Sequence, residues 1–106
     1  MNATYPSREH FVVAVDREYI DLAENFLRNR RQQRQEWRAA LADGNDEILR
    51  RVGDELKGTA AAFGFYSLSD LAAVLEEALE SGDKGAAGST LERMIELLDR
   101  AAVVPR

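Results

Sequence analysis

Apolar residues recur every three to four positions along most of the chain, a spacing that places them on one face of an α-helix. Four such segments follow one another, and the pattern predicts helices over residues 17–42, 46–63, 68–81 and 86–102. No segment shows sustained alternation of apolar and polar residues between turn signals. The sequence therefore predicts an all-α domain. Four amphipathic helices joined by short loops favour an antiparallel four-helix bundle of up-down-up-down order.

Glycines separate the predicted helices. Gly44, Gly64 and Gly82 each follow an apolar-periodic segment, and glycine readily takes the left-handed conformation that closes a helix. Polar residues that can cap a helix stand before each predicted start. They are Asp16, Asn45, Ser67 with Asp70 three residues later, and Asp83.

The sequence also predicts the boundaries of the bundle and the residues of its core. Residues 1–15 are expected to form an extended segment, with Val12, Val13 and Val15 lying across one end of the bundle. Residues 16–102 form the bundle, and residues 103–106 a C-terminal tail. Six large residues on the apolar faces are expected to be buried, namely Leu56, Phe63, Leu71, Leu75, Leu91 and Leu98.

Length and composition agree with one globular domain. The chain has 106 residues, of which 45% are hydrophobic and 31% charged, and this suits a single core. The absence of cysteine excludes disulfides and thiolate chemistry. No apolar run approaches the roughly 20 residues of a membrane span, and no signal-peptide cleavage site is evident. We therefore expect a cytoplasmic protein with no membrane partner.

The charge of the chain is acidic overall but locally basic. A net charge of −5 argues against a nucleic-acid partner. The sole histidine, His10, lies in a polar N-terminal stretch, and we expect it to have no catalytic role. The basic excess of the first predicted helix has two interpretations, a solvated helix face or a surface that meets an acidic protein partner. It consists of Arg28, Arg30, Arg31, Arg34 and Arg38.

The second predicted helix has an unusual polar face. Asp54, Lys57, Gly58 and Ala61 follow one another at i, i+3, i+4 and i+7, opposite the apolar stripe. A glycine inside a helix costs about 0.5–1 kcal/mol relative to alanine. Either another molecule approaches the backbone at Gly58, or Gly58 and Ala61 pack against a neighbouring helix. Helical geometry alone leaves both interpretations open.

The stretch from Gly53 to Phe65, GDELKGTAAAFGF, resembles the signature of histidine-containing phosphotransfer (HPt) domains. In that signature a histidine is followed by any residue, an aliphatic residue, lysine, glycine and small residues, with a second glycine six positions after the first. The resemblance extends over roughly residues 12–102. It implies a four-helix bundle that carries a phosphoryl group on an exposed histidine and exchanges it with receiver-domain aspartates. The residues that fit are Leu56, Lys57, Gly58, Thr59 and Gly64, with Leu75 and Glu76 further on.

The chain departs from the signature at its central position, where Asp54 replaces the acceptor histidine. A carboxylate there would have to form an acyl phosphate, which receivers do with bound Mg²⁺ and a cluster of acidic ligands. The only carboxylate close in sequence is Glu55, which points about 100° around the helix. We therefore predict no metal site, no cofactor and no relay of phosphoryl groups. The chain is either an inactivated form of a phosphotransfer protein or a natural docking variant.

The resemblance also implies the partner, a response-regulator receiver domain or a histidine kinase. The predicted docking face comprises Asp54, Lys57, Gly58 and Ala61, with Arg50 and Arg51 close by. Lys57 and the arginines of the first helix would complement an acidic receiver pocket. The alternative is a helical adaptor or dimerisation bundle in which Lys57 and Gly58 serve packing only, and exposure of Asp54 and Lys57 discriminates between the two. An enzyme with its own active site has no support, because no nucleophile–base pair or phosphate loop is present.

Overall fold

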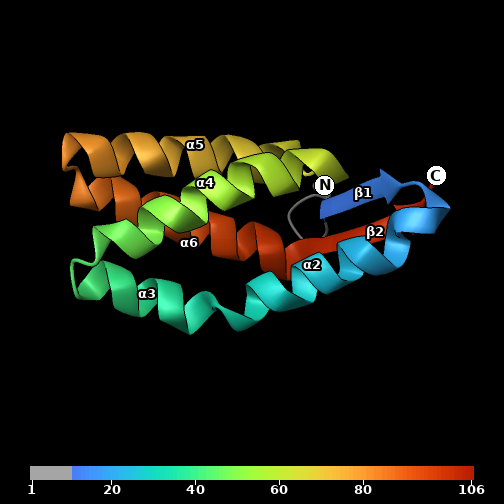
Figure 1. The fold of residues 1–106 in the computed structure, drawn as a ribbon, viewed down its shortest axis with the longest axis horizontal. Coiled ribbons are helices and arrows are strands. Elements are labelled where there is room, and N and C mark those ends of the chain that lie inside the picture. Colours follow the sequence, from blue (N-terminus) through green and yellow to red (C-terminus); the bar gives the residue numbers. More distant parts are fainter. Residues whose placement is uncertain (1–10) are drawn as a thin grey trace, which may run out of the picture.

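The structure, a computed structural model, describes residues 11–106 and is mostly helical (Figure 1), as predicted. His10 lies outside the described residues. No helix within residues 11–106 is long and apolar enough to cross a membrane. The elements in chain order are strand β1 (Phe11–Val15), the 3₁₀ turn η1 (Arg17–Tyr19), helices α2 (Ile20–Gln32), α3 (Arg34–Ala42), α4 (Asp46–Phe63), α5 (Tyr66–Ser81) and α6 (Lys84–Arg100), and strand β2 (Ala101–Pro105).

The first predicted helix, over 17–42, is not continuous. It opens with the 3₁₀ turn, and it breaks at Gln33, which has φ −90° and ψ 0° and separates α2 from α3. The N–H of Gln33 donates to the carbonyl of Arg30 at 3.0 Å, the tighter bonding of a 3₁₀ turn. Residues 28–36 contain no apolar side chain. Packing against the core therefore does not hold this stretch in one straight helix.

The helices end where the glycines predict, whereas the predicted N-terminal capping residues agree less well with the helix starts. Gly44, Gly64 and Gly82 have φ of 71°, 91° and 74°, which confirms their predicted role. Asp83 caps α6 as expected, because its carboxylate accepts a hydrogen bond from the N–H of Ala86 at 3.0 Å. The predicted capping box at Ser67 and Asp70 is wrong. Burial of Phe65 brings the chain into the core at once, so α5 begins at Tyr66 and Ser67 lies inside its first turn.

The core lies between the helices. Four of the six predicted core residues, Leu56, Leu75, Leu91 and Leu98, are buried. The expectation for Phe63 and Leu71 is wrong, because both are only partly buried and pack against the edge of the core. Phe65, in the turn after α4, is fully buried instead. The centroid of its ring lies 5.9 Å from that of Phe26. The largest fully buried side chains are Trp37, Phe65, Leu49, Leu56, Leu68, Leu75, Leu91, Met94 and Leu98.

Residues 11–15 and 101–105 form a small parallel sheet that the periodicity of the sequence does not predict, and the rest of the expected extended segment, residues 1–10, lies outside the described residues. Phe11 pairs with Ala101, and the register continues to Val15 and Pro105. Consequently α6 ends at Arg100 rather than at 102, and most of the predicted tail 103–106 belongs to β2. Arg106 extends the pairing, because its N–H donates to the carbonyl of Val15 at 2.9 Å. The valines of β1 are extended as expected, but their partner is the far end of the chain.

Candidate functional site

Helix α4 presents its predicted polar face to solvent. Asp54, Lys57 and Gly58 are exposed, while Leu49, Gly53, Leu56 and Ala60 of the same helix are buried. A rotation of about 100° per residue separates the two sets. We call the outward set the α4 face; it consists of Arg50, Arg51, Asp54, Lys57 and Gly58, which are exposed, and Ala61, which is half-buried at its edge.

Helix α5 holds the ammonium group of Lys57. Its Nζ donates a hydrogen bond to Oε1 of Glu76 at 2.8 Å. That hydrogen bond, followed by the attraction of the Glu76 charge, raises the pKa of Lys57, and Asp54 and Glu80 add smaller contributions in the same direction. The side chain of Lys57 remains 47% exposed. The ammonium is therefore charged at neutral pH and open to an approaching molecule.

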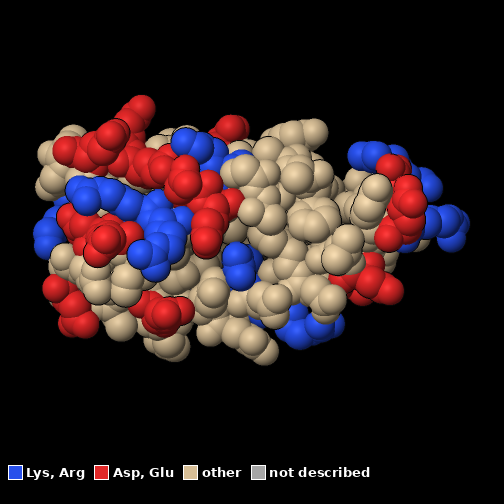
Figure 2. Space-filling model, in the orientation of Figure 1, with Lys and Arg blue, Asp and Glu red and all other residues tan. Residues whose placement is uncertain are grey.

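A hollow in the surface lies between α4 and α5 and is lined by Arg50, Lys57, Glu76 and Glu80. Two cations and two carboxylates share it. Figure 2 shows basic and acidic side chains intermingled over the half of the molecule where α4 begins and α5 ends, with an uncharged area beside them. A negatively charged group that enters the hollow meets two cations, and it shares them with two carboxylates.

An apolar groove lies at the C-terminal end of α4. Among its lining residues are Tyr19, Leu22, Ala62, Phe63 and Tyr66. Leu22 is 56% and Tyr66 67% exposed, and large apolar side chains gathered on a surface often mark a contact with another molecule. The groove was not among the sequence-based predictions. The available signal was that Leu22 and Tyr66 fall outside the apolar stripes of their helices.

The two glycines of α4 occupy different surroundings. A Cβ added to Gly53 would lie 2.9 Å from Cγ of Glu76 and 3.3 Å from the carbonyl oxygen of Ala72, so glycine permits the close approach of α5. A Cβ added to Gly58 would meet no atom of the neighbouring elements within 4 Å in the described part of the chain. The interpretation that Gly58 packs against a neighbouring helix is therefore wrong. Its backbone is open to solvent.

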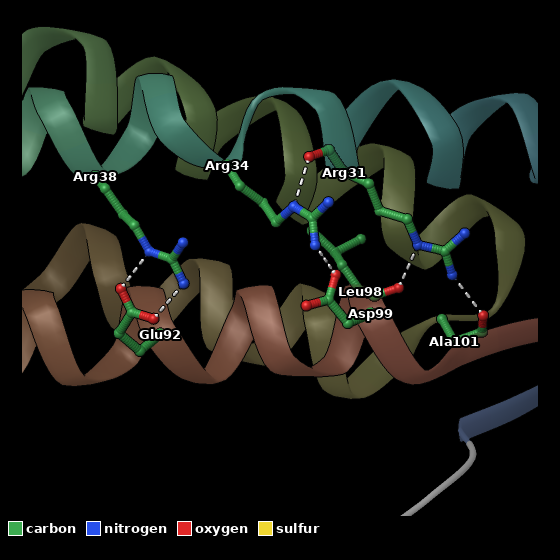
Figure 3. Close-up of polar contacts among 7 residues, drawn as sticks. All are labelled: Arg31, Arg34, Arg38, Glu92, Leu98, Asp99 and Ala101. Atoms are coloured by element: carbon green, nitrogen blue, oxygen red, sulfur yellow. Dashed lines mark hydrogen bonds and ion pairs between the residues drawn. The ribbon is translucent and has the colours of Figure 1, made fainter.

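Arginines of α2 and α3 turn towards α6 (Figure 3). Arg31 donates from Nε to the carbonyl of Leu98 at 2.8 Å and from Nη2 to that of Ala101 at 2.7 Å. Leu98 lies in the last turn of α6 and Ala101 is the residue that follows the helix, where carbonyl groups have no partner within the helix. Arg31 therefore caps the C-terminus of α6 from outside.

Arg34 and Arg38 bind carboxylates of α6. Arg34 pairs with Asp99, and Arg38 donates two hydrogen bonds to Glu92, at 2.9 and 2.8 Å. The hydrogen bond from Arg38 lowers the pKa of Glu92. These arginines join α3 to α6, a role that neither interpretation of the basic run included. Arg31, Arg34 and Arg38 thus have partners on α6 or next to its end, whereas the expectation that they serve an external partner stays a prediction.

The carboxylate of Asp54 stands apart from the ion pairs of the fold. Within residues 11–106 it takes part in none of them. The described residues contain no group of three or more His, Asp or Glu side chains placed to hold a metal ion. The α4 face thus offers a single carboxylate beside three cations and an open stretch of backbone.

Comparison with known proteins gives one match. Residues 21–103 match the family model of the Hpt domain. The match begins in α2, ends in β2 and contains the whole α4 face. Searches of the curated proteins and of the solved structures give no match.

Proposed function

Because the chain belongs to the Hpt domain family, whose members are phosphotransfer modules of two-component phosphorelays, we propose that it docks a receiver domain or a histidine kinase through the α4 face. In this proposal the helices keep the up-down-up-down order, and the protein acts in the cytoplasm without carrying the phosphoryl group itself. The observation that supports the docking role is exposure. Asp54, Lys57 and Gly58 are open to solvent together on α4, inside the family match.

The proposed lack of phosphotransfer rests on Asp54. The HPt signature puts this residue where the acceptor histidine stands. A carboxylate has no imidazole nitrogen to attack the phosphorus, and its negative charge repels an incoming phosphoryl group. Forming an acyl phosphate at Asp54 would require cations that neutralise both groups, and Lys57, the nearest ammonium, is already bonded to Glu76. We infer that docking takes place without transfer.

Charge and shape both contribute to the proposed docking. Lys57 and Arg50 offer cations to an acidic pocket, and Gly58 lets the partner approach the backbone of α4. The apolar groove that contains Tyr66 adds surface whose burial favours association. Arg31, Arg34 and Arg38 are half-buried and hydrogen-bonded to α6 and to Ala101 after it, so the proposal assigns the docking role to the more exposed cations of the α4 face.

A binding screen against purified receiver domains tests this function. The unmodified chain is expected to bind one receiver and to take no radiolabel from its phosphorylated form. Asp54→His is expected to bind the same receiver and to accept label. Lys57→Ala in the Asp54→His background should slow transfer, because it removes the cation nearest to the phosphoryl charge. Lys84→Ala, which removes the only other lysine, is the matched control and should leave transfer unchanged.

Two results would contradict the proposal. An Asp54→His protein that folds, binds the receiver and stays unlabelled would refute the assignment of the acceptor position. Label on the unmodified chain would refute the absence of transfer and would direct attention to His10 or to Asp54 itself.

The second candidate is a helical adaptor or dimerisation bundle with no phosphorelay role. The apolar groove favours it, since Leu22 and Tyr66 suit a second copy as well as a receiver. Light scattering of the chain alone distinguishes the candidates. A dimer that Tyr66→Ser dissociates, together with no binding to any receiver, would support the adaptor.

A further inference from the structure

We propose that Glu76 is a positioning residue that holds the ammonium of Lys57 at the α4 face, and that Gly53 provides the space through which Glu76 reaches it. The inference rests on the proposed function in one respect, because only that function makes the position of this ammonium important. The positioning itself is a property of the protein alone and is testable without a partner.

Helix α5 contacts Lys57 at two points. The carboxylate of Glu76 accepts a hydrogen bond from Nζ at 2.8 Å. The hydroxyl of Ser69 donates to the backbone carbonyl of Lys57 at 2.6 Å. A lysine on an exposed helix face otherwise samples many rotamers. Ser69 thus joins this turn of α4 to α5, and Glu76 of the same helix gives the ammonium its partner.

The side chain of Glu76 passes over Gly53 on its way to Lys57. Its Cγ lies where a Cβ on Gly53 would approach to 2.9 Å, and the Ala72 carbonyl, one turn earlier on α5, would be 3.3 Å away. The stem of Glu76 therefore crosses directly over the Gly53 backbone. This explains why the helix accepts a residue that destabilises it. An alanine at this position would displace the stem and, with it, the carboxylate.

Glu80, one turn further along α5, differs from Glu76 in its exposure and in its contact with Lys57. Glu80 lines the same hollow, but it is exposed, and within the described residues it forms no ion pair with Lys57. The side chain of Glu76 is only 25% exposed. Two carboxylates of one helix thus face the same ammonium, and one of them is built into the contact between the helices. Glu80 is accordingly the matched control for Glu76.

Lysine side-chain NMR tests the positioning in the full chain. The protein has only two lysines, Lys57 and Lys84, so a Lys84→Arg variant assigns both signals. Glu76→Gln should lower the pKa of Lys57 and broaden its distribution of rotamers, and Glu80→Gln should lower it less. Gly53→Ala should act in the same direction as Glu76→Gln, with Gly58→Ala as its control. Circular dichroism verifies that each variant is folded.

The results divide clearly. Equal effects of Glu76→Gln and Glu80→Gln on Lys57 would overturn the role of Glu76. If Gly53→Ala fails to fold, Glu76→Gln still decides the role of Glu76; if Gly53→Ala folds and leaves the Lys57 titration unchanged, the role of Gly53 is overturned.

Phosphotransfer in the Asp54→His background tests whether the position of the ammonium affects a phosphoryl group on residue 54. Adding Glu76→Gln should reduce the transfer rate by up to about 100-fold, because a misplaced cation no longer meets the phosphoryl group. Adding Glu80→Gln should have a smaller effect, and receiver affinity should change little in either case. If Asp54→His transfers and both double variants do so equally, the positioning fails while the proposed function stands. If no receiver binds at all, the proposed function fails and the NMR result still decides the positioning.

Discussion

The chain contains two concentrations of basic side chains, and the fold uses them in opposite ways. Arg31, Arg34 and Arg38 lie on α2 and α3 and are bonded to α6 (Figure 3). On α4, Arg50 is exposed and Lys57 has a single carboxylate partner at the edge of solvent. The arginine run is the denser in sequence, yet it is structural. Both regions have acceptors on a facing helix, and they differ in exposure, since Arg31, Arg34 and Arg38 are half-buried whereas Arg50 and Lys57 are exposed.

The acceptors on α6 show why the first region is internal. Glu92 and Asp99 lie seven residues apart on α6, and they pair with Arg38 and Arg34 of α3. Arg31 adds the carbonyls at the end of α6 and just after it, which need donors from elsewhere.

The largest expected effect comes from removing the support beneath the α4 face. Leu56 is fully buried on the opposite side of that helix, and Leu56→Ala should lower the free energy of unfolding by about 2–5 kcal/mol. Urea denaturation measures it, with Leu22→Ala, at an exposed site, as the control expected to change less than about 0.5 kcal/mol. A loss under about 0.5 kcal/mol for Leu56→Ala would contradict the assignment of this face of α4 to the core.

The next effect separates the two basic regions. Arg31→Ala removes two hydrogen bonds to backbone carbonyls and should lower the free energy of unfolding by about 1–3 kcal/mol, without changing receiver affinity. Lys57→Ala should weaken receiver binding and affect stability less than Arg31→Ala does. Denaturation and binding are measured on the same preparations. The comparison breaks down if Arg31→Ala weakens binding as much as Lys57→Ala.

A smaller effect tests the openness of α4. Gly58→Ala should raise the free energy of unfolding by about 0.5–1 kcal/mol, because alanine is the better helix former and a methyl group has room there. Gly53→Ala should give no such gain, since its methyl group meets α5. Gly58→Leu should weaken receiver binding while the helix stays intact. A loss of stability in Gly58→Ala would show that the site is closed.

The smallest effect concerns acid stability of the arginine region. The hydrogen bond from Arg38 lowers the pKa of Glu92 below its ordinary value of 4.5. A carboxylate with a depressed pKa stabilises the fold above that ordinary value, and the contribution disappears as the pH falls through the pKa of the folded state. Urea midpoints should therefore drop slightly more between pH 7 and pH 3 for the wild type than for Glu92→Gln. Equal drops would show that the exposed pair contributes nothing.

The helices and the polar face of α4 could be read from the sequence because they depend on local periodicity. The start of α4 and the ends of α3, α4 and α5 agree with the predictions, and the glycines that close these helices have the expected conformation. The break at Gln33 depends on missing tertiary contacts, and the pairing of β1 with β2 on residues from opposite ends of the chain. The apolar groove likewise combines residues of three separate segments. Such long-range features leave no periodic trace in a single sequence.

The parallel sheet of β1 and β2 also determines how the domain responds to tension. Phe11 opposes Ala101 and Val15 opposes Pro105, so the chain leaves the sheet at opposite ends of the paired strands. A force that separates residues 11 and 106 pulls the strands lengthwise past each other. Every bond of the ladder is then strained at the same time, whereas an antiparallel hairpin opens one bond after another. We expect the sheet to act as a mechanical clamp, with the bundle shielded until the ladder gives way.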